Sequence, residues 1–145
     1  MRFAIAGPAA VGFTLTCCGC SEKAPVVSPA PPPRQPKAVL VWFTEVEAPA
    51  SVNANDTLLV LLSGVAGSNG CYTFDHLEAT RTASAVEITG HGLHHKSVVC
   101  PAVLPVFENV EHLVLPPFTM GQFKVVARQP DGSEIERAVS IGPPR

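Results

Sequence analysis

The chain has 145 residues, a length that accommodates one folded domain of ordinary size. Fifteen prolines and eleven glycines argue against a helical protein, because both residues interrupt helices, whereas a hydrophobic content of 46% is enough for a core. From residue 38 onward six Lys and Arg stand against eleven Asp and Glu, and the resulting charge of −5 excludes a basic surface for nucleic acid or for anionic lipid headgroups.

Residues 1–20 have the layout of an export signal. A positive start, Met-Arg, precedes an apolar run at residues 3–15 that is too short to span a bilayer and has the length of a secretory hydrophobic region. The run ends in LTCCGC at residues 15–20, which resembles the lipobox of bacterial lipoproteins. That resemblance implies a signal helix that is cleaved and a cysteine that is acylated, with palmitate among the expected groups.

The cysteine that the lipobox resemblance marks for lipidation is Cys18, because Leu15 stands three residues before it. Cys20 is the second candidate, with the small residue Gly19 before it. Two alternatives remain at this point: an ordinary signal peptide, and a metal or redox cluster of Cys17, Cys18 and Cys20. The cluster is disfavoured because no fold would hold the three thiols in place.

Residues 21–37 are predicted to form a proline-rich linker. Six prolines fall between residues 24 and 37, a density that prevents a packed core and favours polyproline II. At about 3.1 Å per residue such a spacer would hold a domain roughly 40 Å from a lipid anchor. The run PAPPPR at residues 29–34 also resembles an SH3 ligand, but an export address favours the spacer.

Residues 38–145 are predicted to form one all-β domain. Alternating and apolar segments separated by Gly, Pro and Ser predict strands at 38–47, 56–63, 71–82, 85–89, 106–115, 121–128 and 134–141. The length of the apolar run LLVLL at residues 58–62 suits a central strand better than a helix. The segment PDGS at residues 130–133 predicts a hairpin, because Asp-Gly favours positive φ.

Three further local predictions concern side-chain placement. In the strand at residues 71–82, period-two alternation places Tyr72, Phe74, His76 and Glu78 on one face. Residues 90–96, GHGLHHK, are interpreted as a loop, and Glu108 and Glu111 are assigned to the exposed face of their strand.

Seven short strands in about a hundred residues favour a two-sheet sandwich. Residues 115–125, LPPFTMGQFKV, resemble the L-x-x-G-x-Y-x-V entry to the penultimate strand of fibronectin type III and other immunoglobulin-like domains. The resemblance extends over residues 38–142 and implies an immunoglobulin-like two-sheet sandwich of about seven strands. Phe123 replaces the usual Tyr, so the hydroxyl of a tyrosine corner is absent.

Cys71 and Cys100 are the only cysteines outside the N-terminal segment. In an exported chain they are predicted to form a disulfide that staples the β domain.

The histidines offer the strongest candidate for a metal site. His91, His94 and His95 cluster in the segment at residues 90–96, and imidazoles near one another bind zinc or copper. A solvated loop is favoured, because no H-x-E or C-x-x-C motif accompanies them and Gly90 and Gly92 give little preorganisation.

Two other kinds of site are weighed and disfavoured. A blue-copper site built from Cys100, His112 and Met120 has ligand spacings much longer than the tight loop of cupredoxins. A hydrolase is disfavoured because AGSNG at residues 66–70 lacks the strand–turn–helix context of a nucleophile elbow.

The sequence therefore predicts a non-catalytic cell-envelope lipoprotein that displays a binding or structural module, without cofactor or nucleic acid and with a protein partner in the envelope. The alternative is a periplasmic metal-binding protein that uses His91, His94 and His95. If the chain follows the lipoprotein sorting of enteric bacteria, as its lipobox resemblance implies, the absence of Asp after Cys18 or Cys20 favours the outer membrane over the inner. Strand edges and loops are the expected contact surfaces.

Overall fold

The computed structural model describes residues 34–97 and 99–145, which belong to one compact unit, Pro33–Arg145. The predicted signal peptide, the lipobox-like segment with Cys18 and Cys20, and the predicted linker as far as residue 33 lie outside the described residues. Throughout the described part the regular structure is β, and no helix there is long and apolar enough to cross a membrane.

Nine strands form the described part of the domain. Their bounds are β1 Lys37–Leu40, β2 Trp42–Glu47, β3 Ser51–Asn53, β4 Leu58–Val65, β5 Tyr72–Arg81, β6 Ala85–His94, β7 Val106–Val114, β8 Gly121–Arg128 and β9 Glu134–Gly142.

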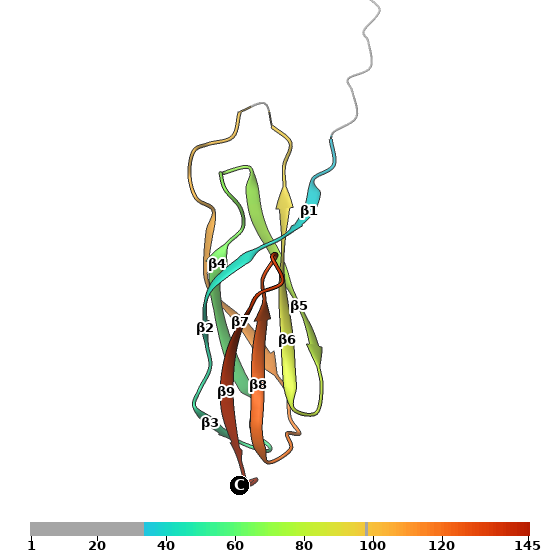
Figure 1. Ribbon diagram of the computed structural model, residues 1–145, viewed down its shortest axis with the longest axis vertical. Coiled ribbons are helices and arrows are strands. Elements are labelled where there is room, and N and C mark those ends of the chain that lie inside the picture. Colours follow the sequence, from blue (N-terminus) through green and yellow to red (C-terminus); the bar gives the residue numbers. More distant parts are fainter. Residues whose placement is uncertain (1–33, 98) are drawn as a thin grey trace, which may run out of the picture. The chain divides into compact units, whose positions relative to one another are not determined.

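The strands form two sheets. The larger sheet has six strands in the order β1-β6-β8-β9-β3, with β5 paired to β6, and Figure 1 shows β5, β6, β8 and β9 running side by side. The smaller sheet has three strands in the order β2-β4-β7. The all-β, two-sheet prediction is confirmed. A strictly immunoglobulin-like sandwich is not, because the parallel pairs β3·β9 and β6·β8 make the larger sheet mixed.

Two local features account for nine strands where about seven were predicted. The predicted strand at 38–47 divides, because β1 pairs with β6 in the larger sheet and β2 pairs with β4 in the smaller one. Between them Val41 is fully buried, and its backbone N–H donates to the carbonyl of Gly90 at 3.0 Å. The short strand β3, within a predicted break, pairs in parallel with β9.

The core lies between the two sheets. Phe74 of β5 stacks on Phe107 of β7 with ring centroids 4.5 Å apart, which joins the larger sheet to the smaller one. The largest fully buried side chains come from both sheets and from the Val41 crossover: Val41, Val46, Leu58, Val60, Leu62, Val86, Ile88, Phe123, Val125 and Val139. Because this core and every strand pair belong to the described unit itself, the unit has what a domain needs to fold alone.

The outer edge of β2 is closed by side chains from the larger sheet. The side-chain amide of Gln129, in the turn that follows β8, accepts a hydrogen bond from the Phe43 N–H at 3.0 Å and donates one to the Phe43 carbonyl at 2.8 Å. Arg137 donates to the carbonyl of Val46 at 3.0 Å. These bonds satisfy backbone groups that a second strand would otherwise pair.

Strand β6 runs five residues further than the predicted 85–89, so the interpretation of residues 90–96 as a loop is wrong up to His94. The reason is packing across the sandwich. Gly90 and Gly92 face the core, where a Cβ on Gly90 would lie 2.3 Å from Val41 Cγ2 and one on Gly92 would lie 2.7 Å from the carbonyl oxygen of Thr73. The glycines make room for these neighbours.

A bulge in β5 corrects the predicted face assignment. The register shifts between Phe74, which pairs with Gly92, and His76, which pairs with His91. Phe74 packs against the core, whereas His76 is exposed. The extra residue moves His76 and Glu78 to the outer face of the sheet, because one inserted residue reverses the alternation.

The predicted disulfide and the predicted hairpin are both present. Cys71 and Cys100 are bonded, with Cα atoms 5.2 Å apart and a sequence separation of 29. At the turn between β8 and β9, Gly132 has φ of 85°, and the Asp131 carboxylate accepts hydrogen bonds from Ser133 N–H at 2.9 Å and from Ser133 Oγ at 2.7 Å. These hydrogen bonds lower the pKa of Asp131.

Candidate functional site

Strand β4 is apolar on both of its faces, although only one faces the core. Leu58, Val60 and Leu62 are fully buried between the sheets. Leu59 and Leu61 alternate with them and therefore lie on the outer face of the smaller sheet. The solvent face of an antiparallel sheet normally carries polar residues, so outward leucines on a central strand indicate a surface that something else covers.

Neighbouring strands extend this outward apolar surface. Leu59 lies opposite Leu113 of β7, and the two are 39% and 56% exposed. At the other end of β4, Val65 lies between Trp42 of β2 and Val106 of β7, both exposed. Apolar residues thus occur at both ends of the outer face.

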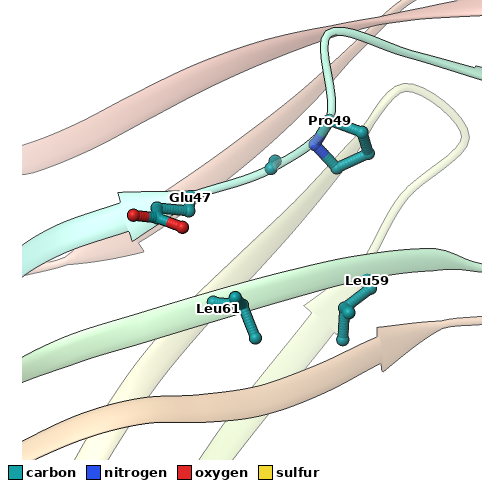
Figure 2. A pocket seen from close by; sticks show the side chains of 5 residues that line it. Glu47, Pro49, Leu59 and Leu61 are labelled. Carbon is teal, nitrogen blue, oxygen red and sulfur yellow. The ribbon is translucent and has the colours of Figure 1, made fainter.

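Two hollows lie on this face. Figure 2 shows Leu59 and Leu61 projecting from the same side of β4, with Glu47 at the end of β2 and Pro49 just beyond it. This hollow has a volume of about 350 Å³. A second, of about 420 Å³, lies further along the same three strands and is lined by the residues Thr44, Glu45, Ser63, Gly64, Val65, Leu104, Val106, Phe107, Glu108 and Asn109.

Acidic side chains border the apolar strip on both sides. Glu45 and Glu47 belong to β2, and Glu108 and Glu111 to β7, whereas the three strands contain no Lys or Arg. In the register of the sheet, Leu61 pairs with Glu47 on one side and with Glu111 on the other. The exposure of Glu108 and Glu111 expected from the sequence is confirmed.

We call this surface the acidic-apolar face. It comprises Trp42, Glu45, Glu47, Leu59, Leu61, Ser63, Val65, Val106, Glu108, Glu111 and Leu113. Within the described residues, none of its four carboxylates lies within ion-pair distance of a Lys, Arg or His side chain. The face therefore presents uncompensated negative charge.

The outer face of the larger sheet differs, because its charges are paired with one another. Arg128 donates to Glu87 at 2.9 Å and also bonds Glu134, and Lys124 donates to Glu136 at 3.1 Å. The hydrogen bond to Glu87 and the nearby charge of Glu134 raise the pKa of Arg128. Because these charges are paired within the sheet, they are less available to a binding partner than the carboxylates of the acidic-apolar face.

The structure separates the three histidines that the sequence places in one loop. His91 and His94 are three positions apart in β6, so their side chains lie on opposite faces of the sheet. His94 stacks on Tyr72 with ring centroids 4.3 Å apart, on the core side. His95 follows the strand and bonds Thr73 Oγ1 through Nε2 at 3.2 Å.

His91 instead meets a histidine from the neighbouring strand. Its ring stacks on His76 at 4.8 Å, and its Nε2 lies 3.1 Å from Glu78, while His76 Nδ1 lies 2.8 Å from Asp75. Each imidazole thus has its own carboxylate. Across residues 34–97 and 99–145, no group of three or more His, Cys, Asp or Glu side chains is arranged to hold a metal ion.

The residues considered for a blue-copper site, Cys100, His112 and Met120, are also unsuited to one. The sulfur of Cys100 is bonded to Cys71 and is not a free thiolate. His112 belongs to β7, where burial lowers its pKa, and Met120 is exposed.

Comparison with known proteins adds no assignment. No family model matches the chain, and neither a curated protein nor a solved structure matches it. The acidic-apolar face, which was not predicted from the sequence, is therefore the candidate functional site. The available signal was the run LLVLL, which was interpreted only as a central strand.

Proposed function

We propose that the chain is a non-catalytic cell-envelope lipoprotein whose domain binds a partner through the acidic-apolar face. The observation that carries the proposal is the outward placement of Leu59, Leu61 and Leu113 on adjacent strands of the smaller sheet. Exposed apolar residues that are contiguous and rimmed by polar residues are typical of protein interaction sites.

The envelope address is part of the same proposal. It is supported by the export layout of residues 1–20 and by Leu15 three residues before Cys18, with the proline-rich spacer behind them. The disulfide is consistent with it, since such bonds persist in oxidising compartments. Mass spectrometry of the mature N-terminus tests the anchor. Acylated Cys18 is expected, and an unmodified N-terminus downstream of Cys20 would contradict it.

A distant relation to immunoglobulin-like sandwiches is the finer part of the fold proposal. It is supported by the entry to β8, where Gly121 has φ of 117° and the buried rings of Phe118 and Phe123 meet edge to face at 5.1 Å. Positive φ at this point favours glycine, as the resemblance requires. The two parallel strand pairs, β3·β9 and β6·β8, differ from a strictly immunoglobulin-like sandwich.

Cross-linked affinity purification of the full chain from its native envelope tests the binding role. The variant Leu113→Ser removes an apolar contact from the acidic-apolar face. Met120→Ser, at an exposed apolar residue outside that face, is the matched control. A partner that is recovered with the native chain and with Met120→Ser, but lost with Leu113→Ser, is expected. Equal recovery with both variants would remove the face from the proposal.

A further inference from the structure

We infer that the partner presents an amphipathic, basic α-helix that lies along β4, with its apolar stripe on the leucines and its Lys or Arg side chains beside the carboxylates. This inference depends on the proposed function, because it names what the acidic-apolar face binds. The width, the length and the charge of the face each support such a helix.

The width of the face matches a helix. Neighbouring strands are about 4.8 Å apart, so the carboxylate-bearing strands β2 and β7 lie about 10 Å from each other on either side of β4. The diameter of an α-helix with its side chains is about 10–12 Å. In the row that joins Glu47, Leu61 and Glu111, an apolar residue is centred between two acids. An amphipathic helix has the complementary order, an apolar stripe between charged flanks.

The length of the face sets the size of that helix. Eight residues of β4 extend over about 26 Å at 3.3 Å per residue. A helix of about 17 residues covers the same distance at 1.5 Å per residue. Leu59 and Val65 are about 20 Å apart along this line at 3.3 Å per residue. Residues of the partner at i, i+3, i+4, i+7, i+11 and i+14, which extend over about 21 Å, would contact Leu59, Leu61 and Val65 in turn.

The charge of the face selects a cationic partner over two others. A second copy that docked through the same face would oppose four carboxylates with four more, and like charges across an interface are unfavourable. An anionic lipid surface would be repelled for the same reason. Lys or Arg on a partner helix would instead pair with Glu45 and Glu47 on one side and with Glu108 and Glu111 on the other.

The probe for this inference is an 18-residue synthetic peptide of Leu and Lys with leucines at helical spacing and no tryptophan. Two control peptides have Glu in place of every Lys, or the same composition with the leucines dispersed. Trp42 lies at one end of the face and is the only tryptophan of the chain, so its emission reports occupancy. Titrations use both the full chain and residues 34–145, at low and at physiological salt.

The Lys-Leu peptide is expected to bind at least about tenfold more tightly than either control peptide. The double variant Glu47→Gln/Glu111→Gln should weaken that binding by about fivefold at low salt and reduce its salt dependence, since exposed ion pairs are individually weak. The matched control Glu134→Gln/Glu136→Gln removes two charges from the larger sheet, where both acids are already paired, and should leave the affinity unchanged.

Each contrary result has a separate meaning. Equal weakening by the two charge variants, or equal binding of the Glu-Leu peptide, overturns the basic-helix inference but leaves a docking face if Leu113→Ser still abolishes binding. Full affinity of Leu113→Ser for the peptide overturns the inference, because the peptide then binds outside the face. The proposed function fails only if the native partner is also recovered equally with Leu113→Ser and Met120→Ser. If the full chain dimerises through this face, a second copy is the occupant and the inference is overturned. If residues 34–145 bind the peptide but the full chain excludes it, the chain's own N-terminal segment is the occupant, and the inference is likewise overturned.

Discussion

The substitution Gly90→Ala is expected to destabilise the domain, although alanine is a better strand residue than glycine. A Cβ at this position would lie 2.3 Å from Val41 Cγ2 and 2.9 Å from Phe43 Cζ, whereas carbon atoms in contact prefer about 3.5–4.0 Å. Val41 and Phe43 are both buried between the sheets, so neither side chain can withdraw without disturbing the core.

The magnitude follows from two opposing effects. Forcing an extra carbon into a packed core costs about 1–3 kcal/mol. Alanine also restricts the unfolded chain, which favours folding by about 0.4–1 kcal/mol. The free energy of unfolding should therefore fall by about 1–2 kcal/mol in urea denaturation of residues 34–145 followed by far-ultraviolet circular dichroism.

Gly142→Ala is the matched control, because a Cβ there would meet its nearest atoms at ordinary distances of 3.7 and 3.8 Å. Its stability should be unchanged or slightly higher. In a double-mutant cycle, Val41→Ala removes the atom that Gly90→Ala collides with, so the double variant should lose at least about 0.5 kcal/mol less than the sum of the single variants. Full stability of Gly90→Ala would contradict the inward placement of Gly90 and restore the loop interpretation.

Three further predictions concern other parts of the domain. Replacing Cys71 and Cys100 together by Ser should lower the free energy of unfolding by about 3–4 kcal/mol in the chain-entropy model, and thiol titration of the denatured, unreduced domain should find no free thiol. Hydrogen bonds from Ser133 lower the pKa of Asp131 in the folded state. Its ionised carboxylate therefore stabilises the fold above the unfolded-state pKa of about 3.9, and this stabilisation is lost as the pH falls through the lower folded-state pKa. Acid denaturation of Asp131→Asn should lack this pH-dependent contribution. Calorimetric titration with zinc and copper should show no submicromolar binding, and tight one-to-one binding lost in His91→Ala would support a metal-binding protein instead.

The features that were predictable from the sequence are those set by local chemistry. Strand β8 was placed at its observed bounds because Gln122 to Arg128 alternate between faces, and the following hairpin because Asp131-Gly132 favours its turn. The disulfide followed from counting, since only two cysteines lie outside the N-terminal segment. In the strand and the hairpin, the residues that determine the structure are close together in sequence. For the disulfide, only one pairing was possible outside the N-terminal segment.

The features that were missed depend on contacts between distant segments. Gly90 and Gly92 have low strand propensity, and only the side chains of the first strands, packed across them, explain why β6 continues to His94. The bulge in β5, which reverses the face of His76, likewise has no sequence signal in its own strand. Grouping the histidines by sequence therefore failed to identify the pair that stacks, His76 with His91.

The acidic-apolar face was missed for a related reason. Periodicity shows that β4 is apolar on both faces, and such a strand is normally enclosed by its own domain. Whether a second layer covers Leu59 and Leu61 depends on the number of strands and on where the chain crosses between sheets. In this domain the second layer lies on one side of β4 alone, so the outward leucines form a surface rather than a core.

Site-specific photo-crosslinking in cells that naturally make the chain tests the binding face most directly. A photoreactive residue in place of Leu113 samples the acidic-apolar face, and the same residue in place of Thr80 samples the outer face of the larger sheet. A single adduct is expected from position 113, lost when Glu47→Lys and Glu111→Lys are added, with none of comparable yield from position 80. Adducts of equal yield from both positions, or from position 80 alone, would contradict the assignment of the smaller sheet as the binding surface.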